Sequence, residues 1–194
     1  MDLGLPDADY KTAYISLSAE INVTTTEQII AVATQLVTQQ GFTRLYFLIS
    51  TPGGTVMNGM NVYNVLRGLP AKIVFHNVGN VDSIGNAIFL AGDERYACPH
   101  STFMFHGVGM DMPAGYRLEQ KSGEDLLDSI LADQKRIAAV LVERTNLNDA
   151  QAADLFKEAR TKDAAYAAGV GIISDIRDVN VPPGAPVFSL VFQR

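Results

Sequence analysis

A serine and a histidine occupy positions that an acyl-transfer reaction would need. Ser83 lies at the start of a predicted helix, in GNVDSIG at 79–85, and His106 ends a predicted strand. A serine hydroxyl is a weak nucleophile that needs an adjacent base, and imidazole takes up and returns a proton near neutral pH. The N–H of Ile84 would be unpaired and able to stabilise an oxyanion. The same positions also suit a helix N-cap and a structural histidine, and both interpretations stay open here.

A pair of glycines follows another predicted strand. The sequence TPGG at 51–54 comes directly after the nearly continuous apolar run RLYFLIS at 44–50. Proline and paired glycines indicate a tight turn, or a loop whose backbone N–H groups approach a ligand closely. The pattern alone does not decide between the two.

Composition excludes several other chemistries. The chain of 194 residues has 15 basic and 21 acidic residues and a formal net charge of −6, which argues against nucleic acid as a partner. It has neither a phosphate-binding loop nor a dinucleotide fingerprint, so we expect no ATP hydrolysis by this chain itself. Its three histidines and single cysteine, Cys98, exclude an internal disulfide and predict no metal site and no cofactor.

The N-terminal sequence lacks the basic start and apolar core of a signal peptide, and the apolar runs are too short to span a membrane. We therefore expect a cytoplasmic protein without a membrane partner.

Hydrophobic periodicity predicts alternating strands and helices. Strands are expected at 12–18, 44–50, 71–76, 94–98, 102–106, 170–176 and 187–192. Helices are expected at 24–40, 57–68, 83–92, 119–145, 149–158 and 161–168, and loops at 77–82 and 107–118. This order predicts an α/β fold with a largely parallel sheet. One domain is expected over 1–178, followed by a C-terminal extension, 179–194, with a terminal strand at 187–192.

Three blocks, taken together, resemble the Clp protease proteolytic subunit family. Residues 45–56 resemble the family's strand and SPGG-x-V loop, with Thr51 in place of the usual serine. Residues 79–85 and the LAG at 90–92 resemble its nucleophile stretch and helix, and 95–106 resemble its R-x-A-x-P-N strand running into M-I-H. The resemblance implies a ClpP/crotonase-type fold of repeated β-β-α units in a single domain. The helix at 119–145 would be the protruding handle through which two rings stack.

The resemblance also implies a serine endopeptidase and assigns its site. Ser83 would be the nucleophile and His106 the general base, with the N–H groups of Gly54 and Ile84 forming the oxyanion hole. Gly53, Thr55 and Val56 would bind the substrate as an added strand. The partners implied are a peptide or unfolded protein, copies of the chain in a heptameric ring or double ring, and an AAA+ unfoldase. The short segment before the first strand argues against productive docking of that unfoldase.

The third catalytic residue of the family, an aspartate, has no direct counterpart. Lys157 holds its place, so either Glu158 or Asp154 substitutes for it through a shifted loop, or a serine–histidine dyad works weakly, or the protein is inactive. Asp82 would bring negative charge beside the oxyanion unless its side chain points away. Two alternatives to an active peptidase therefore remain: an inactive scaffold or regulatory subunit, and a crotonase-type acyl-CoA enzyme.

Overall fold

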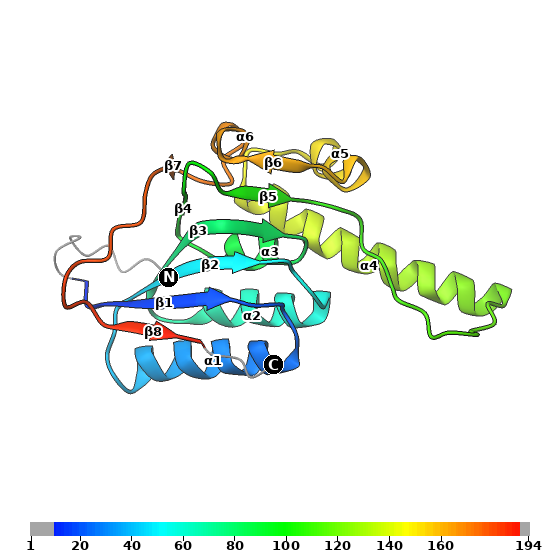
Figure 1. Cartoon of the computed structure of the whole chain (residues 1–194). Helices are drawn as coiled ribbons and strands as arrows, with labels where there is room; N and C mark the ends of the chain where they lie inside the picture. The colour runs from blue at the N-terminus through cyan, green and yellow to red at the C-terminus, as the bar shows by residue number, and fades with distance from the viewer. Residues whose placement is uncertain (1–9, 191–194) are drawn as a thin grey trace.

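The computed structural model describes residues 10–190, which form one eight-stranded sheet with helices packed against it (Figure 1). The strands are β1 (Thr12–Ser18), β2 (Arg44–Thr51), β3 (Lys72–Asp82), β4 (Glu94–Ala97), β5 (Thr102–Met104), β6 (Thr161–Asp163), β7 (Asp175–Ile176) and β8 (Val187–Ser189). The helices are α1 (Val23–Thr38), α2 (Val56–Gly68), α3 (Gly85–Phe89), α4 (Gln120–Arg144), α5 (Asp149–Glu158) and α6 (Ala164–Gly169). The expected α/β class is confirmed.

The sheet is almost entirely parallel, as expected. Its main path runs β6-β5-β3-β2-β1-β8, while β4 pairs with β3 and β7 pairs with β4. Only β5 and β6 pair in the antiparallel sense among the strands described. The long strand β3 has two neighbours on one side, because residues 74–77 pair with β4 and residues 80–82 pair with β5. The positions of β4 and β5 in the sheet are therefore both set by their pairing with β3.

A row of aromatic rings packs against the centre of the sheet. Phe47 of β2 stacks on Phe75 of β3 with ring centroids 4.8 Å apart, and Phe75 lies 5.9 Å from Phe89 of α3. Phe89 in turn meets Phe103 of β5 edge to face at 5.3 Å. All four rings are fully buried, and each such burial contributes about 2–3 kcal/mol. The row ties α3 to the strands on both sides of it.

Two expectations around β3 and α3 are corrected. The expected loop at 77–82 is strand, because these residues continue β3 and its last three pair with β5. The local sequence, with Gly79 and two asparagines, hides this pairing, which depends on a partner distant in the chain. The helix expected at 83–92 is the shorter α3, preceded by a turn.

The C-terminal third also differs in detail. The first three residues of the helix expected at 161–168 form the strand β6 instead, because residues 161–163 pair with β5. The strand expected at 170–176 is confined to β7. The terminal strand expected at 187–192 is β8, whose pairing with β1 adds it to the same sheet, and residues 191–192 lie outside the described part.

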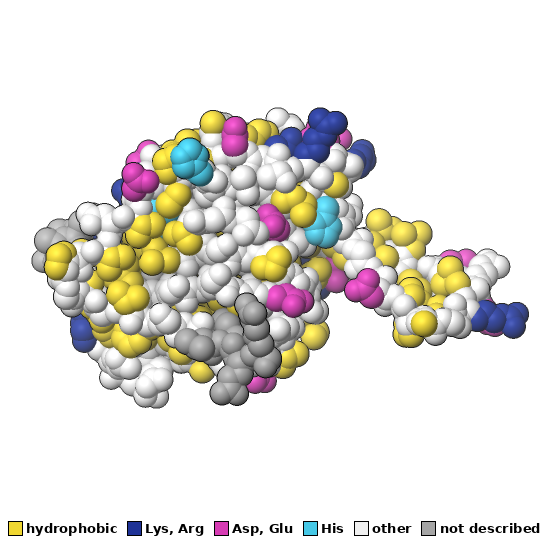
Figure 2. Space-filling view, viewed as in Figure 1, with side chains coloured by type: hydrophobic (Ala, Val, Ile, Leu, Met, Phe, Trp, Pro, Cys, Tyr) yellow, Lys and Arg dark blue, Asp and Glu magenta, His cyan; other side chains and the backbone are white. Residues whose placement is uncertain are grey.

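The helix α4 projects from the body of the molecule (Figure 1). Its C-terminal half packs on the body through Ile137, Val140 and Leu141. Its outer half and the segment before it, residues 110–131, form what we call the arm, along which hydrophobic side chains gather (Figure 2). These side chains line a cavity of about 330 Å³ and include Met110, Met112, Tyr116 and Leu118, all of them exposed.

One arginine joins four segments of the chain. The Arg95 guanidinium donates to the carbonyl oxygens of Ile172 at 2.7 Å, Gly92 at 2.9 Å, Arg144 at 3.0 Å and Gly171 at 3.2 Å. Burial, together with the neighbouring Arg144 cation, lowers the pKa of Arg95 to about 10. The side chain stays charged at neutral pH and donates to all four carbonyls, of which that of Gly92 also accepts from Arg144 at 3.0 Å.

We expect Arg95→Met to lower the free energy of unfolding by about 3 kcal/mol, because it leaves several partly buried carbonyls without a partner. Urea denaturation measures this loss. The control is Arg136→Met, which removes only an exposed ion pair with Asp133 within α4 and should cost less than about 1 kcal/mol. Equal losses in the two variants would contradict the role given to Arg95.

Candidate functional site

Ser83 occupies a strained turn between β3 and α3. Its φ is +54°, and the only other described non-glycine residue with a positive φ is Ala159. Its N–H donates to the Met104 carbonyl at 2.8 Å, which fastens the turn to β5. Backbone strain of this kind costs about 1 kcal/mol or more and is concentrated at functional sites. The conformation turns the serine side chain out of the sheet at the carboxyl end of β3.

The capping interpretation of Ser83 is not what the structure shows. The N-cap of α3 is Ile84, without a side-chain cap, and the Asn86 N–H bonds the Ser83 carbonyl at 3.1 Å. Within residues 10–190, Ser83 Oγ makes no hydrogen bond. The Ser83 side chain is half-buried. Because its hydroxyl has no hydrogen-bond partner in the described residues, it is free to react.

Asn86 is a supporting residue that sequence reasoning missed. Its buried amide donates to the Ser83 carbonyl at 3.1 Å and to the Met104 carbonyl at 2.9 Å. These two hydrogen bonds hold the turn at Ser83 against β5. An asparagine inside an apolar helix was the available signal, because a buried amide needs such partners.

The glycine pair packs against Ser83. A Cβ at Gly53 would lie 2.7 Å from Ser83 Cβ, so only glycine allows this approach. Thr51 shapes the loop, since its hydroxyl donates to the Ala19 carbonyl at 2.7 Å and accepts from the Gly53 N–H at 3.1 Å. The loop then bridges Ile21, which donates to the Gly53 carbonyl at 2.7 Å and accepts from the Thr55 N–H at 2.8 Å.

Two backbone donors near Ser83 are left over. The hydrogen bonds of the loop with Ile21 use the Gly53 carbonyl and the Thr55 N–H, so the Gly54 N–H faces the other way. In the described residues, neither the Gly54 nor the Ile84 N–H donates a hydrogen bond. Backbone N–H groups without an acceptor are suited to binding an anionic oxygen.

His106 follows β5 by two residues and is exposed. Because β3 and β5 are parallel, hydrogen-bonded neighbours, Ser83 and His106 leave the same edge of the sheet. No hydrogen bond joins the two side chains within residues 10–190. The imidazole instead bonds through Nδ1 to the Gly107 carbonyl oxygen at 2.7 Å.

The Asp82 carboxylate has a hydrogen-bond partner on its own strand. Its Oδ2 accepts from Asn80 Nδ2 at 2.6 Å, and Asn80 is itself bonded by the Ser50 hydroxyl at 2.9 Å. Asn80 also donates to the Thr51 carbonyl at 3.2 Å. The carboxylate is thus held back along β3 by a polar network between β2 and β3.

The two expected acids belong to ion pairs. Glu158 accepts from Lys162 at 2.7 Å, and this bond and charge lower the pKa of Glu158. Asp154 lies 3.6 Å from Lys157. Among the described residues, neither carboxylate bonds His106. The helix α5 reaches the site through its backbone, because the Phe156 carbonyl accepts from the Gly107 N–H at 3.1 Å.

A groove of about 430 Å³ runs between the glycine loop and the segment after His106. One wall is formed by residues 54–57 and the other by residues 108–111. Its charged lining is acidic and consists of Glu20, Asp111 and Asp133. Acidic side chains lie where the arm meets the body (Figure 2). Sequence reasoning placed 107–118 in a loop but did not predict that it faces the glycine pair.

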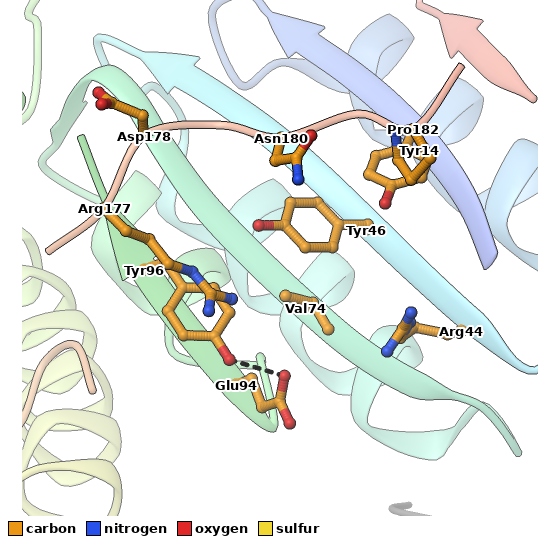
Figure 3. A pocket seen from close by; sticks show the side chains of 10 residues that line it. All are labelled: Tyr14, Arg44, Tyr46, Val74, Glu94, Tyr96, Arg177, Asp178, Asn180 and Pro182. Carbon is orange, nitrogen blue, oxygen red and sulfur yellow. Dashed lines mark hydrogen bonds between the residues drawn. The ribbon is translucent and has the colours of Figure 1, made fainter. Parts of the chain in front are cut away.

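A second cavity, of about 420 Å³, shares no lining residue with this groove (Figure 3). Arg177 lies over the Tyr96 ring at 3.2 Å, and Tyr96 donates to Glu94 at 2.8 Å. Behind it, the fully buried His76 bonds Tyr46 through Nδ1 at 2.8 Å and the Arg177 carbonyl through Nε2 at 2.9 Å. Burial lowers the pKa of His76. His76 thus fastens the C-terminal segment to β3.

Neither a metal site nor a membrane-spanning helix is found in residues 10–190. No group of three or more histidine, cysteine, aspartate or glutamate side chains in residues 10–190 is placed to hold a metal ion. No described helix combines the length and apolar character that a bilayer crossing requires.

The chain is similar in sequence to proteins of one known family. The family model described as Clp protease matches residues 7–180. An ATP-dependent Clp protease proteolytic subunit of Arabis hirsuta is 28% identical over 140 residues, covering 70% of this chain and 69% of that protein. Proteins of the same description from Liriodendron tulipifera and Vitis vinifera are 26% and 28% identical over 140 residues, covering 70% of this chain and 67% and 69% of theirs.

Proposed function

The chain belongs to the Clp protease family, and from that premise we propose that it is a serine endopeptidase subunit with Ser83 as nucleophile and His106 as general base. The observation that carries the proposal is the turn at Ser83. It has a positive φ, an unbonded hydroxyl and the closely packed Gly53 beside it. Nothing in the packing of β3 and α3 requires a serine there, so the strain points to a chemical role.

The proposed reaction uses groups already described. Ser83 Oγ attacks the carbonyl carbon of a bound peptide while its proton passes to His106 Nε2. The new oxyanion accepts hydrogen bonds from the N–H groups of Gly54 and Ile84. The carbon–nitrogen bond then breaks, and Nε2 returns the proton to the leaving amine. Water repeats the sequence on the acyl-enzyme, which releases the acid and restores the serine.

This chemistry requires Nε2 to come within about 3 Å of Ser83 Oγ when a peptide binds. His106 is exposed and held only through Nδ1 in the described structure, so its ring has room to turn. Hydrogen bonds of this kind often tighten only in the complex.

The groove supplies the binding site in this proposal. An extended peptide adds as a strand along Gly53, Gly54, Thr55 and Val56, with the segment 108–111 on its other side. Main-chain hydrogen bonding tolerates many sequences, and the acidic lining favours substrates with basic side chains. We further propose that copies of the chain assemble into a heptameric ring or double ring, with the apolar arm as a contact between rings. The ring would form a chamber for unfolded protein, and an unfoldase partner belongs to the same proposal.

A fluorophosphonate probe tests the proposed function. It reacts with activated serines by losing fluoride, so peptide mass spectrometry of the labelled full chain should locate the adduct on Ser83. Ser83→Ala should then remain unlabelled. An unlabelled native chain, or labelling that persists in Ser83→Ala, would rule out the proposed peptidase.

An inactive scaffold or regulatory subunit is the second candidate. One observation favours it: no carboxylate in the described residues bonds His106, and Lys157 holds the place of the family's aspartate. Lys157 directly follows Phe156, whose carbonyl bonds the Gly107 N–H, and its exposed side chain lies 3.6 Å from Asp154.

We therefore expect Lys157→Asp to raise kcat for a fluorogenic peptide by about 10–100-fold, since an orienting carboxylate is worth up to about 10⁴ in such sites. Lys157→Ala removes the cation without adding a carboxylate and should change kcat by less than about threefold. Labelling of Ser83 in Lys157→Asp but not in the native chain would establish the inactive alternative. An unchanged kcat in both variants would show that a side chain at position 157 does not orient the histidine.

A further inference from the structure

We propose that the backbone carbonyl of Gly107 positions His106, taking the part that a carboxylate side chain would otherwise play. The inference rests on the proposed function for its catalytic meaning. The observation behind it is the hydrogen bond of 2.7 Å between His106 Nδ1 and the Gly107 oxygen. Gly107 is a positioning residue here, because it acts through the histidine and not on the substrate.

The hydrogen bond determines which ring nitrogen carries the proton. A carbonyl oxygen only accepts, so Nδ1 must be the donor in the neutral ring. The other nitrogen, Nε2, then holds the lone pair and is the one able to accept the proton of Ser83. This is the tautomer that a general base needs, and it is obtained without a charged partner.

Gly107 is itself held from two sides. Its N–H donates to the Phe156 carbonyl near the end of α5, at 3.1 Å. A Cβ at Gly107 would lie 3.3 Å from Gln134 Oε1 of α4, so α4 packs closely against the same residue. The acceptor is thus anchored to the helices beside the sheet, although the segment that follows it is exposed.

The nearby carboxylates have other partners. Glu158 is bonded to Lys162 at 2.7 Å, Asp154 lies 3.6 Å from Lys157, and Asp82 accepts from Asn80 at 2.6 Å. A carboxylate that moved to Nδ1 would have to give up one of these partners and displace the Gly107 oxygen. The backbone acceptor needs neither change.

Nitrogen NMR of the ¹⁵N-histidine-labelled full chain tests the tautomer directly. The protein has three histidines, and His106→Asn identifies the signals of His106. We expect Nδ1 to be the protonated nitrogen of the neutral ring and Nε2 the unprotonated one. The opposite tautomer would overturn the inference. The measurement needs no substrate, so its result is independent of whether a fluorophosphonate labels Ser83.

Kinetics of carboxylate variants provides the second arm. Glu158→Gln and Asp154→Asn, singly and together, should leave kcat and KM within about twofold of the native values, because exposed pairs contribute little. A loss in kcat of about 100-fold with an unchanged KM would identify that carboxylate as the orienting group and overturn the role of Gly107.

Discussion

Replacing Ser83 by glycine is expected to abolish peptide hydrolysis and to leave the fold at least as stable as before. The hydroxyl is the proposed nucleophile, and its loss removes covalent catalysis, which is worth about 10⁴-fold or more. Glycine adopts the φ of +54° without the penalty that serine carries. We expect the free energy of unfolding to stay equal or to rise by up to about 1 kcal/mol, after the greater freedom of the unfolded chain is subtracted.

Peptide turnover and urea denaturation measure the two effects on the same samples. The matched control is Ala159→Gly, at the only other described non-glycine position with positive φ, +49°, at the end of α5. It should give a similar gain in stability and keep full activity. Full activity in Ser83→Gly would refute the nucleophile, and a large loss of stability would show that the serine is there for structural reasons.

Gly54→Ala is the substitution with the second largest expected effect. Its φ is +149°, which L-residues avoid, and an added Cβ would lie 2.1 Å from the Ile21 carbonyl oxygen. The Ile21 oxygen belongs to the backbone and cannot turn aside as a side chain would, so the loop must move. We expect kcat to fall by about 10²–10³, because the Gly54 N–H leaves the oxyanion hole. The free energy of unfolding should fall by about 2–3 kcal/mol as the bridge to Ile21 breaks.

The two effects are separated by measuring kcat under conditions in which circular dichroism shows the variant fully folded. Gly68→Ala is the control, since Gly68 ends α2, is exposed and has nothing within 4 Å of an added Cβ. It should be neutral or slightly stabilising. A folded Gly54→Ala protein with native kcat would exclude this N–H from the reaction.

The local sequence pattern was enough to predict those helices and strands whose own hydrophobic residues follow a regular spacing. The amphipathic α1 and α4 and the apolar β2 lie close to their expected ranges. The local pattern failed to predict strands whose hydrogen-bonded partner strand is distant in the sequence. Residues 77–82 and 161–163 became strand because β5 lies between them, and nothing in their own sequence indicates that neighbour.

The site divides in the same way. Ser83, His106 and the glycine pair could be selected in advance, because their types carry chemistry and their blocks resemble a family. Asn86 and the Gly107 carbonyl could not, because their parts depend on hydrogen bonds that no spacing predicts. The missing acid is the clearest case. A sequence comparison searches for a carboxylate side chain, whereas every residue has a backbone carbonyl oxygen, so its role leaves no mark in the sequence.

The aromatic row of the core has a consequence for how the two halves of the site move. β3 ends at Ser83 and carries Phe75, whose ring is stacked between those of β2 and α3. Local opening of β3 would have to expose this row, so it should be as rare as unfolding of the whole molecule. His106 is exposed just beyond the end of β5, and within the described residues its ring is held through Nδ1 alone. We therefore expect the Ser83 backbone to fluctuate less than the His106 side chain. A bound peptide that contacts both residues would restrict the motion of the histidine.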